Sequence, residues 1–327
     1  MWFIATVIVS GTYISSSLLF TRFPHLLPSF VKSRKGWKNE KNFAKSAHIS
    51  HRGGAGEFYE NTLKAFKGSQ SIGTQMLELD VHLTKDEFVV ISHDQNLKRV
   101  TGQNINIKEV EFENLPKLLN QVPIDFAYKR IFQSEDQSSE HKSIPLLEEI
   151  FVQFPDLNIN IDIKTYDEKL IEKVNELIKK YDRENRSIWG SFSDKTTEKC
   201  YQTNPNIGLL FSMKRVLILL LYFYSGLLPY VTFKETHLEI PMPSIAYKKF
   251  GPEINSKQKI LANICDFLLM RPWLFQHLKS RGIHTYVWVL NSEEEYQRAF
   301  QDLGVSGVMT DYPTMLQDFL QRNPRFK

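Results

Sequence analysis

Residues 76–84 read MLELDVHLT, and this stretch decides the fold class. Its leucines and valine occupy every second position, and Glu78, Asp80 and His82 occupy the positions between them. Because successive side chains of a strand point to opposite faces, one face is apolar and the other is ionisable. A second strand is predicted at LNINIDIK (157–164), and it ends in Asp162 and Lys164. Two strands of the predicted sheet therefore end in charged side chains.

Further strands are expected on both sides of these two. They are the apolar runs at 48–53, 87–94, 186–193, 206–212, 237–244, 284–290 and 307–311. Most are separated by helix-length segments, including 60–73, 144–154 and a helix through the 170s, and this alternation favours parallel β/α architecture. If 87–94 belongs to an insertion after the second strand, eight strands remain, as in a (β/α)₈ TIM barrel. The alternative is an open doubly wound sheet, but polar residues at the ends of several strands suit a barrel better.

Three carboxylates mark a candidate metal site. Glu78 and Asp80 are separated by one residue on a strand, so both point to the same side, and Asp162 ends another strand. Carboxylate oxygens suit a hard divalent cation, Mg²⁺ or Ca²⁺, rather than Zn²⁺. Ordinary salt bridges on an exposed strand are the alternative reading of this pattern.

Two histidines are the candidate proton carriers, His51 and His93, because histidine titrates near neutral pH. Arg52 and Lys164 are the candidate phosphate ligands. A lone histidine is more often a structural residue, but here each follows a predicted strand and has a charged neighbour. Ser92, His93 and Asp94 cannot form a catalytic triad among themselves, since neighbouring strand residues point to opposite faces.

The order and spacing of these groups resembles the glycerophosphodiester phosphodiesterase family over residues 48–315, nearly all of the chain after its N-terminal region. The matching motifs are His51-Arg52-Gly53, Glu60-Asn61-Thr62, Glu78-Leu79-Asp80-Val81, Ser92-His93-Asp94, Asn160-Ile161-Asp162-Ile163-Lys164, Ser191-Phe192, Trp288-Val289-Leu290-Asn291 and Thr310-Asp311-Tyr312-Pro313. The apolar N-terminus and the LEIPMPS segment look most like the membrane subgroup with lysophospholipase D activity.

The resemblance implies a role for each of these residues. His51 and His93 would be general acid and base, and Arg52 and Lys164 would hold the phosphate. Glu60 and Trp288 are expected at the substrate pocket, where Glu60 would help to orient the cluster. The metal ligands would be Glu78, Asp80 and Asp162. Many members of the family have Glu where this chain has Asp162, and the shorter carboxylate would change the preferred metal or its distance.

The N-terminal residues predict a membrane anchor. Residues 2–21 contain no charged side chain, and their number suits one transmembrane helix over 1–24. Basic residues dominate the following linker (25–47), which predicts a catalytic domain, 48–327, in the cytosol. A signal peptide would begin with basic residues instead, and a buried helix of a soluble protein would not explain the basic linker.

A second apolar segment, residues 216–233, is also uncharged. A span at this position would divide the barrel between two sides of a bilayer, so a second transmembrane helix is rejected. Either this segment is an apolar barrel helix, or it dips into the membrane interface beside the active site, which its tyrosines favour. The insertion after the second strand is expected over about 85–145.

These observations predict a metal-dependent phosphodiesterase that releases the headgroup of lysophospholipids at a membrane, with the endoplasmic reticulum expected from the subgroup. One alternative is an enzyme for water-soluble diesters such as glycerophosphocholine, and another is an inactive lipid-binding barrel. The net charge of +4 is too small to indicate nucleic-acid binding. The two cysteines, far apart in the chain, indicate neither a disulfide framework nor a zinc site.

Overall fold

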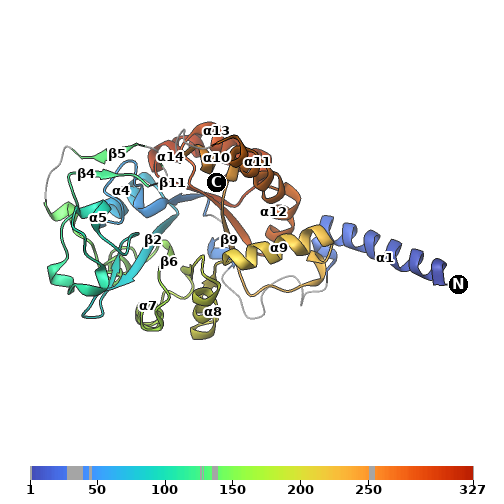
Figure 1. Ribbon diagram of the computed structural model, residues 1–327, viewed down its shortest axis with the longest axis horizontal. Coiled ribbons are helices and arrows are strands. Elements are labelled where there is room, and N and C mark those ends of the chain that lie inside the picture. Colours follow the sequence, from blue (N-terminus) through green and yellow to red (C-terminus); the bar gives the residue numbers. More distant parts are fainter. Residues whose placement is uncertain are drawn as a thin grey trace.

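Eight parallel strands form a nearly closed barrel in the computed structural model, which describes residues 2–27, 40–43, 46–125, 127, 129–134, 139–249 and 255–326 (Figure 1). The strands lie in the order β8-β7-β6-β2-β1-β11-β10-β9, and a bridge between Leu210 and His237 connects the two ends of this order. Their bounds are β1 His48–Ser50, β2 Met76–Leu83, β6 Asn158–Ile163, β7 Ser187–Gly190, β8 Gly208–Leu209, β9 His237–Pro241, β10 His284–Trp288 and β11 Gly307–Thr310. The predicted (β/α)₈ fold is confirmed.

Helices connect most of the strands. They are α4 Leu63–Ile72, α6 Leu147–Gln153, α7 Glu168–Lys180, α8 Asp194–Thr203, α9 Met213–Ser225, α10 Pro243–Lys249, α11 Ser256–Leu269, α12 Pro272–Lys279, α13 Glu293–Gln297 and α14 Pro313–Arg322. Side-chain caps explain where several of them begin, because a hydroxyl or carboxylate accepts a hydrogen bond from an otherwise unpaired N–H of the first turn. Thr62, for example, accepts from the N–H of Ala65 at the start of α4.

The alternation in β2 and β6 separates the core from the site. The apolar side chains of both strands, such as Leu79 and Ile161, are buried against helices α6, α7 and α8. Burying each such side chain contributes roughly 1.5–3 kcal/mol. In the parallel register Glu78 pairs with Asn160 and Asp80 with Asp162, so the polar residues of the two strands lie side by side on the other face.

The residues predicted as an insertion lie outside the barrel order in the described part of the chain, which leaves out 126, 128 and 135–138. The insertion contains β3 Val89–Ile91, which pairs antiparallel with β2 outside the barrel order, helix α5 Lys98–Thr101, and the hairpin β4 Gln121–Pro123 and β5 Ile131–Gln133. Its small core is built around Val90, Leu97 and Val100. This core holds the residues after β3, including His93, against the barrel.

The N-terminal helix α1 begins and ends at Trp2 and Arg22. No helix in the described residues is long and apolar enough to cross a membrane, so the predicted transmembrane anchor over 1–24 is not supported. Most of the predicted basic linker lies outside the described residues, at 28–39 and 44–45.

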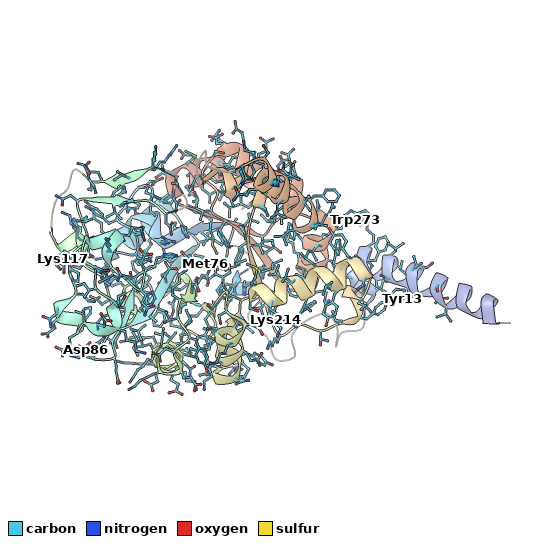
Figure 2. All side chains as sticks on the ribbon, viewed as in Figure 1. Tyr13, Met76, Asp86, Lys117, Lys214 and Trp273 are labelled. Carbon is cyan, nitrogen blue, oxygen red and sulfur yellow. The ribbon has the colours of Figure 1, made fainter. Side chains whose placement is uncertain are left out.

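Helix α1 makes polar contacts with the barrel. The Tyr13 hydroxyl donates to the carbonyl of Ser225 at 2.5 Å, and that of Ser17 donates to the carbonyl of Gly226 at 2.7 Å. Tyr13 and Trp273 lie at the same end of the molecule (Figure 2) and both line an apolar groove there.

The apolar segment 216–233 contains most of α9 and a 3₁₀ turn at Leu228–Tyr230. The helix ends at Ser225 and Gly226 follows in the left-handed region, so the segment does not form one continuous span. Val216 and Leu219 pack inward, whereas Met213, Leu217 and Leu221 are exposed.

Candidate active site

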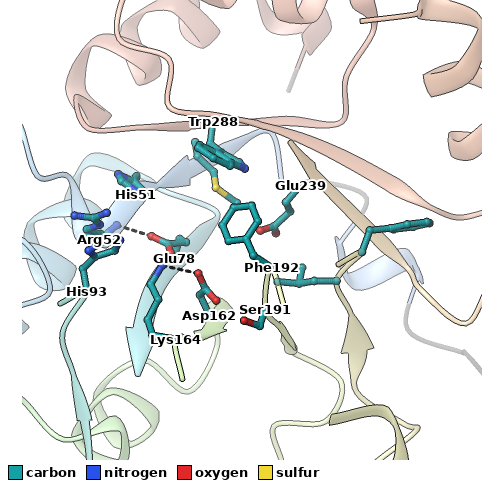
Figure 3. Close-up of a pocket in the computed structure, with 13 residues that line it drawn as sticks. His51, Arg52, Glu78, His93, Asp162, Lys164, Ser191, Phe192, Glu239 and Trp288 are labelled. Carbon is teal, nitrogen blue, oxygen red and sulfur yellow. Dashed lines mark hydrogen bonds and ion pairs between the residues drawn. The ribbon is translucent and has the colours of Figure 1, made fainter. Parts of the chain in front are cut away.

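A cavity opens at the carboxyl ends of the barrel strands, and most of the predicted site residues line it (Figure 3). Those that do are His51, Arg52, Glu78, His93, Asp162, Lys164 and Trp288. The structure thus brings together residues from both halves of the sequence. Asp80 and Glu60 do not line the cavity, but each is within 3.5 Å of the Arg52 guanidinium.

Arg52 is fixed by its backbone as well as by its side chain. It follows β1 in a tight turn with φ of 50°, in the left-handed region, and its N–H donates to Glu78 at 2.8 Å. Gly54 in the same turn has φ of 91°, and a Cβ there would lie 2.8 Å from Pro313. Burial disfavours the guanidinium charge, but Glu60 and Asp80 outweigh burial and raise the pKa of Arg52. The Arg52 side chain is therefore permanently positively charged and held in one position.

Lys164 lies between two carboxylates. Its Nζ is 2.8 Å from Oδ1 of Asp80 and 2.6 Å from Oδ2 of Asp162. Burial opposes its charge, but these carboxylates prevail and raise the pKa of Lys164. Asn61 donates a further hydrogen bond to Asp80 at 2.9 Å. Lys164 and Arg52 therefore provide two cations on the same side of the cavity, as phosphate binding requires.

The three predicted metal ligands are neighbours but do not surround a common point. Across the described parts of the chain, no three His, Cys, Asp or Glu side chains are arranged to hold a metal ion. The donor chemistry nevertheless fits a cation: Oδ1 of Asp162 is buried without a hydrogen-bond partner. Burial and the Asp80 charge also raise the pKa of Glu78 well above its ordinary value. A divalent cation would give Oδ1 of Asp162 a partner and would stabilise the charged form of Glu78, provided that Lys164 gives up one of its carboxylate contacts.

His51 belongs to a buried chain of hydrogen bonds. Its Nδ1 is 2.7 Å from Oδ1 of Asp311, and Asn291 donates to the other oxygen of Asp311 at 2.8 Å. Burial and the Arg52 charge lower the pKa of His51 more than Asp311 raises it. His51 is therefore neutral near pH 7. With Nδ1–H donated to Asp311, its Nε2 carries the lone pair of a general base.

His93 is held by residues of the insertion. Its Nδ1 is 2.7 Å from Asp94, and Arg99 donates to the other oxygen of Asp94 at 2.6 Å. The Arg99 guanidinium also donates two hydrogen bonds to the carboxylate of Glu60, at 2.7 and 2.8 Å. Glu60 in turn accepts a hydrogen bond from Arg52. Glu60 thus connects the insertion to the phosphate side of the site and does not line the pocket itself.

Several functional neighbours were not predicted from the sequence. Asp94 and Asp311 stand in the matched motifs, but only the structure shows that each contacts a histidine. Arg99 lies in the part of the insertion without a regular pattern, so no sequence signal indicated it. Glu239 could have been noticed, because it is the one carboxylate in the otherwise apolar strand HLEIP, and it lines the cavity.

Comparison with known proteins agrees with this geometry. Residues 51–315 match the Glycerophosphoryl diester phosphodiesterase family. Human lysophospholipase D GDPD1 is 50% identical over 311 residues, which cover 95% of this chain and 94% of that protein. Human lysophospholipase D GDPD3 is 34% identical, with 96% and 94% covered.

Solved structures agree on the fold. An Oleispira antarctica phosphodiesterase in complex with the product sn-glycerol-3-phosphate superposes with a TM-score of 0.58 at 20% identity, covering 84% of this chain and 96% of that one. The sequence resemblance is thereby confirmed. The chain belongs to the glycerophosphoryl diester phosphodiesterase family and is a phosphoric diester hydrolase.

Proposed function

We propose that this enzyme is a lysophospholipase D, which hydrolyses a lysophospholipid to lysophosphatidic acid and a free headgroup alcohol. The observation that carries the proposal is the cavity itself: His51 with its Asp311 partner, His93, and the cations Arg52 and Lys164 line or border one space. Relatives that cover nearly the whole chain are named lysophospholipase D. An inactive barrel is disfavoured because each predicted proton carrier and phosphate cation is in place.

The two histidines have different surroundings, and we assign their roles accordingly. His51 is buried beside Asp311, and its lowered pKa keeps it neutral, so it fits the general base. It would take a proton from water or from the neighbouring glycerol hydroxyl. His93, which is more exposed, would then protonate the leaving alcohol. Arg52 and Lys164 would stabilise the charge that develops on the phosphate oxygens.

We propose that Glu78 and Asp162, together with Asp80, hold a divalent cation, Mg²⁺ or Ca²⁺. The unpaired Oδ1 of Asp162 and the raised pKa of Glu78 support this assignment. When bound, the cation would supply positive charge to the phosphodiester. Carboxylate oxygens are ligands that both metals accept.

A lysophospholipid is preferred over a water-soluble diester because of the exposed apolar residues near the mouth. The N–H of Met213 donates to the carbonyl of Phe192, which lines the cavity. From Met213 an exposed stripe continues along one face of α9 through Leu217, Leu221 and Tyr224, with exposed fractions between 50% and 69%. We propose that this stripe lies at the lipid surface and receives single-chain lipids. Cytosolic orientation and an endoplasmic reticulum location stay predictions.

Product analysis of purified full-length protein tests this function. Incubation with lysophosphatidylcholine should yield choline and lysophosphatidic acid, identified by mass spectrometry. A faster reaction with glycerophosphocholine would favour the water-soluble substrate class instead. Release of fatty acid without choline would contradict the assignment, since that product requires cleavage of the acyl ester.

A further inference from the structure

The active-site cavity has two chemically different halves (Figure 3). One half, from β1, β2, β3 and β6, carries the histidines, the two cations and the carboxylates discussed above. The other half, from the ends of β7 to β11, is apolar and aromatic apart from one serine and one carboxylate. Its residues are Ser191, Phe192, Leu210, Phe211, Glu239, Trp288 and Met309.

Glu239 is the ionisable group of this second half, and a bound cation would favour its carboxylate form. It lies on β9, deep in the protein, and keeps part of its surface open to the cavity. Asn160 of β6 donates to its Oε1 at 2.8 Å across the barrel interior and so fixes its position. In the part of the chain that the structure describes, no Lys, Arg or His forms an ion pair with it. Glu239 has no role in the proposed hydrolysis.

Two aromatic rings stand near the carboxylate at the mouth of the same half. Phe192 and Trp288 meet edge to face with ring centroids 5.6 Å apart. Figure 3 shows Glu239 on the side of the cavity toward Trp288 and Phe192, away from Arg52 and His93. Aromatic faces attract ammonium ions, most strongly where water is excluded. A carboxylate beside them adds the opposite charge.

We propose that Glu239, Phe192 and Trp288 form a subsite for the ammonium group of a zwitterionic lysophospholipid headgroup. The proposal rests on the lysophospholipase D function and names the headgroup class that this site selects. With the phosphate held by Arg52 and Lys164, the ester oxygen stays beside the histidines. The two-carbon linker of choline or ethanolamine then allows the cation to reach the other half of the cavity.

Other occupants of this half fit less well. An acyl chain would press hydrocarbon against the polar carboxyl group of Glu239 and leave its remaining hydrogen-bonding capacity without a partner, which is costly. A glycerol hydroxyl could accept or donate one hydrogen bond, but it would leave the aromatic rings without a matching partner. An ammonium ion would interact favourably with both the Glu239 carboxylate and the aromatic rings. It would also offset the burial that, with the nearby Asp162 charge, raises the pKa of Glu239 to about 8.

The test compares two substrates that differ in headgroup charge. Lysophosphatidylcholine carries an ammonium, whereas lysophosphatidylglycerol has the same chain and phosphate but no cation. In E239Q the Asn160 hydrogen bond can persist while the charge is lost. We expect kcat/KM for lysophosphatidylcholine to fall about tenfold or more, as for loss of a desolvated cation contact, and kcat/KM for lysophosphatidylglycerol to stay within about threefold.

A second variant, F192L, keeps the proposal testable if E239Q does not fold. Phe192 is 49% exposed, so F192L leaves the core intact, and it should lower activity on the choline substrate more than on the glycerol one. Free choline should inhibit the wild type more strongly than its uncharged isostere 3,3-dimethylbutanol, and E239Q should abolish that difference.

Each other outcome has a separate meaning. Equal losses with both lipids would overturn the subsite, and a raised metal requirement in that case would assign Glu239 to the cation site. No loss with either lipid would also overturn it. If the wild type cleaves neither lipid, the proposed function fails, but binding of choline against dimethylbutanol, measured by calorimetry, still decides whether the subsite exists.

Discussion

Replacing Asp311 with asparagine should impair His51 as a general base. Asp311 accepts from His51 at 2.7 Å and from Asn291 at 2.8 Å through its two oxygens. Asparagine in place of Asp311 keeps the shape but offers one oxygen and one N–H₂ group. Either the amide nitrogen faces Asn291, which is also a donor, or it faces His51 and forces the proton onto Nε2. Nε2 is the atom expected to act as base.

The expected loss in D311N follows from this geometry. General base catalysis contributes roughly 10²–10⁴-fold, so kcat/KM should fall by a factor in that range. The stability cost should be smaller, about 1–3 kcal/mol, because one charge-assisted hydrogen bond is exchanged for a poorer one. Since the carboxylate of Asp311 raises the pKa of His51, its loss lowers that pKa further. The base must be neutral to act, so the acid limb of the rate profile should move to lower pH.

The assay is headgroup release from lysophosphatidylcholine between pH 5 and 9, together with thermal unfolding of each variant. The exposed Asp318 on α14 provides a matched control, since D318N changes the same chemical group away from the cavity and should leave kcat/KM nearly unchanged. A folded D311N enzyme that keeps more than about a third of wild-type kcat/KM would refute the role of Asp311 and, with it, the assignment of His51 as base.

Three further predictions concern the rest of the site. EDTA should abolish activity, and D162N should raise the concentration of Mg²⁺ or Ca²⁺ needed to restore it; full activity in EDTA would exclude the proposed cation. E60Q leaves the guanidinium groups of Arg52 and Arg99 without their shared carboxylate, which should cost about 3–5 kcal/mol and lower the unfolding temperature by roughly 6–15 °C; an unchanged melting curve would contradict this. L217E, on the exposed stripe of α9, should slow cleavage of micellar lysophospholipid several-fold but leave hydrolysis of glycerophosphocholine unaffected, whereas equal effects on both would argue against a lipid-facing stripe.

Much of the barrel could be predicted because strand and helix patterns are local. The alternation in 76–84 predicted Leu79 and Asp80 on opposite faces, and in the structure Leu79 packs in the apolar core while Asp80 contacts Lys164. Short apolar strands between helices gave the correct number and order of strands. The site residues at strand ends followed from the fold, since the carboxyl ends of barrel strands share one mouth.

Other features depend on contacts that the sequence does not encode locally. Asp311 reaches His51 across 260 residues, and Arg99 reaches Glu60 from an insertion without a regular pattern. The placement of Lys164 between Asp80 and Asp162 could not be predicted from strand alternation, which gives the side of a residue but not its partner. The N-terminal anchor was predicted from length and lack of charge alone, and the described residues do not support it.

Headgroup release from lysophosphatidylcholine, followed by mass spectrometry of both products, tests the central claim most directly. Reactions should contain Mg²⁺, Ca²⁺ or EDTA, with H51A as the inactive control. We expect stoichiometric choline and lysophosphatidic acid with at least one of the two metals and neither product in EDTA or with H51A. Choline release that H51A retains in full, or products that come from cleavage of the acyl ester, would contradict the central claim.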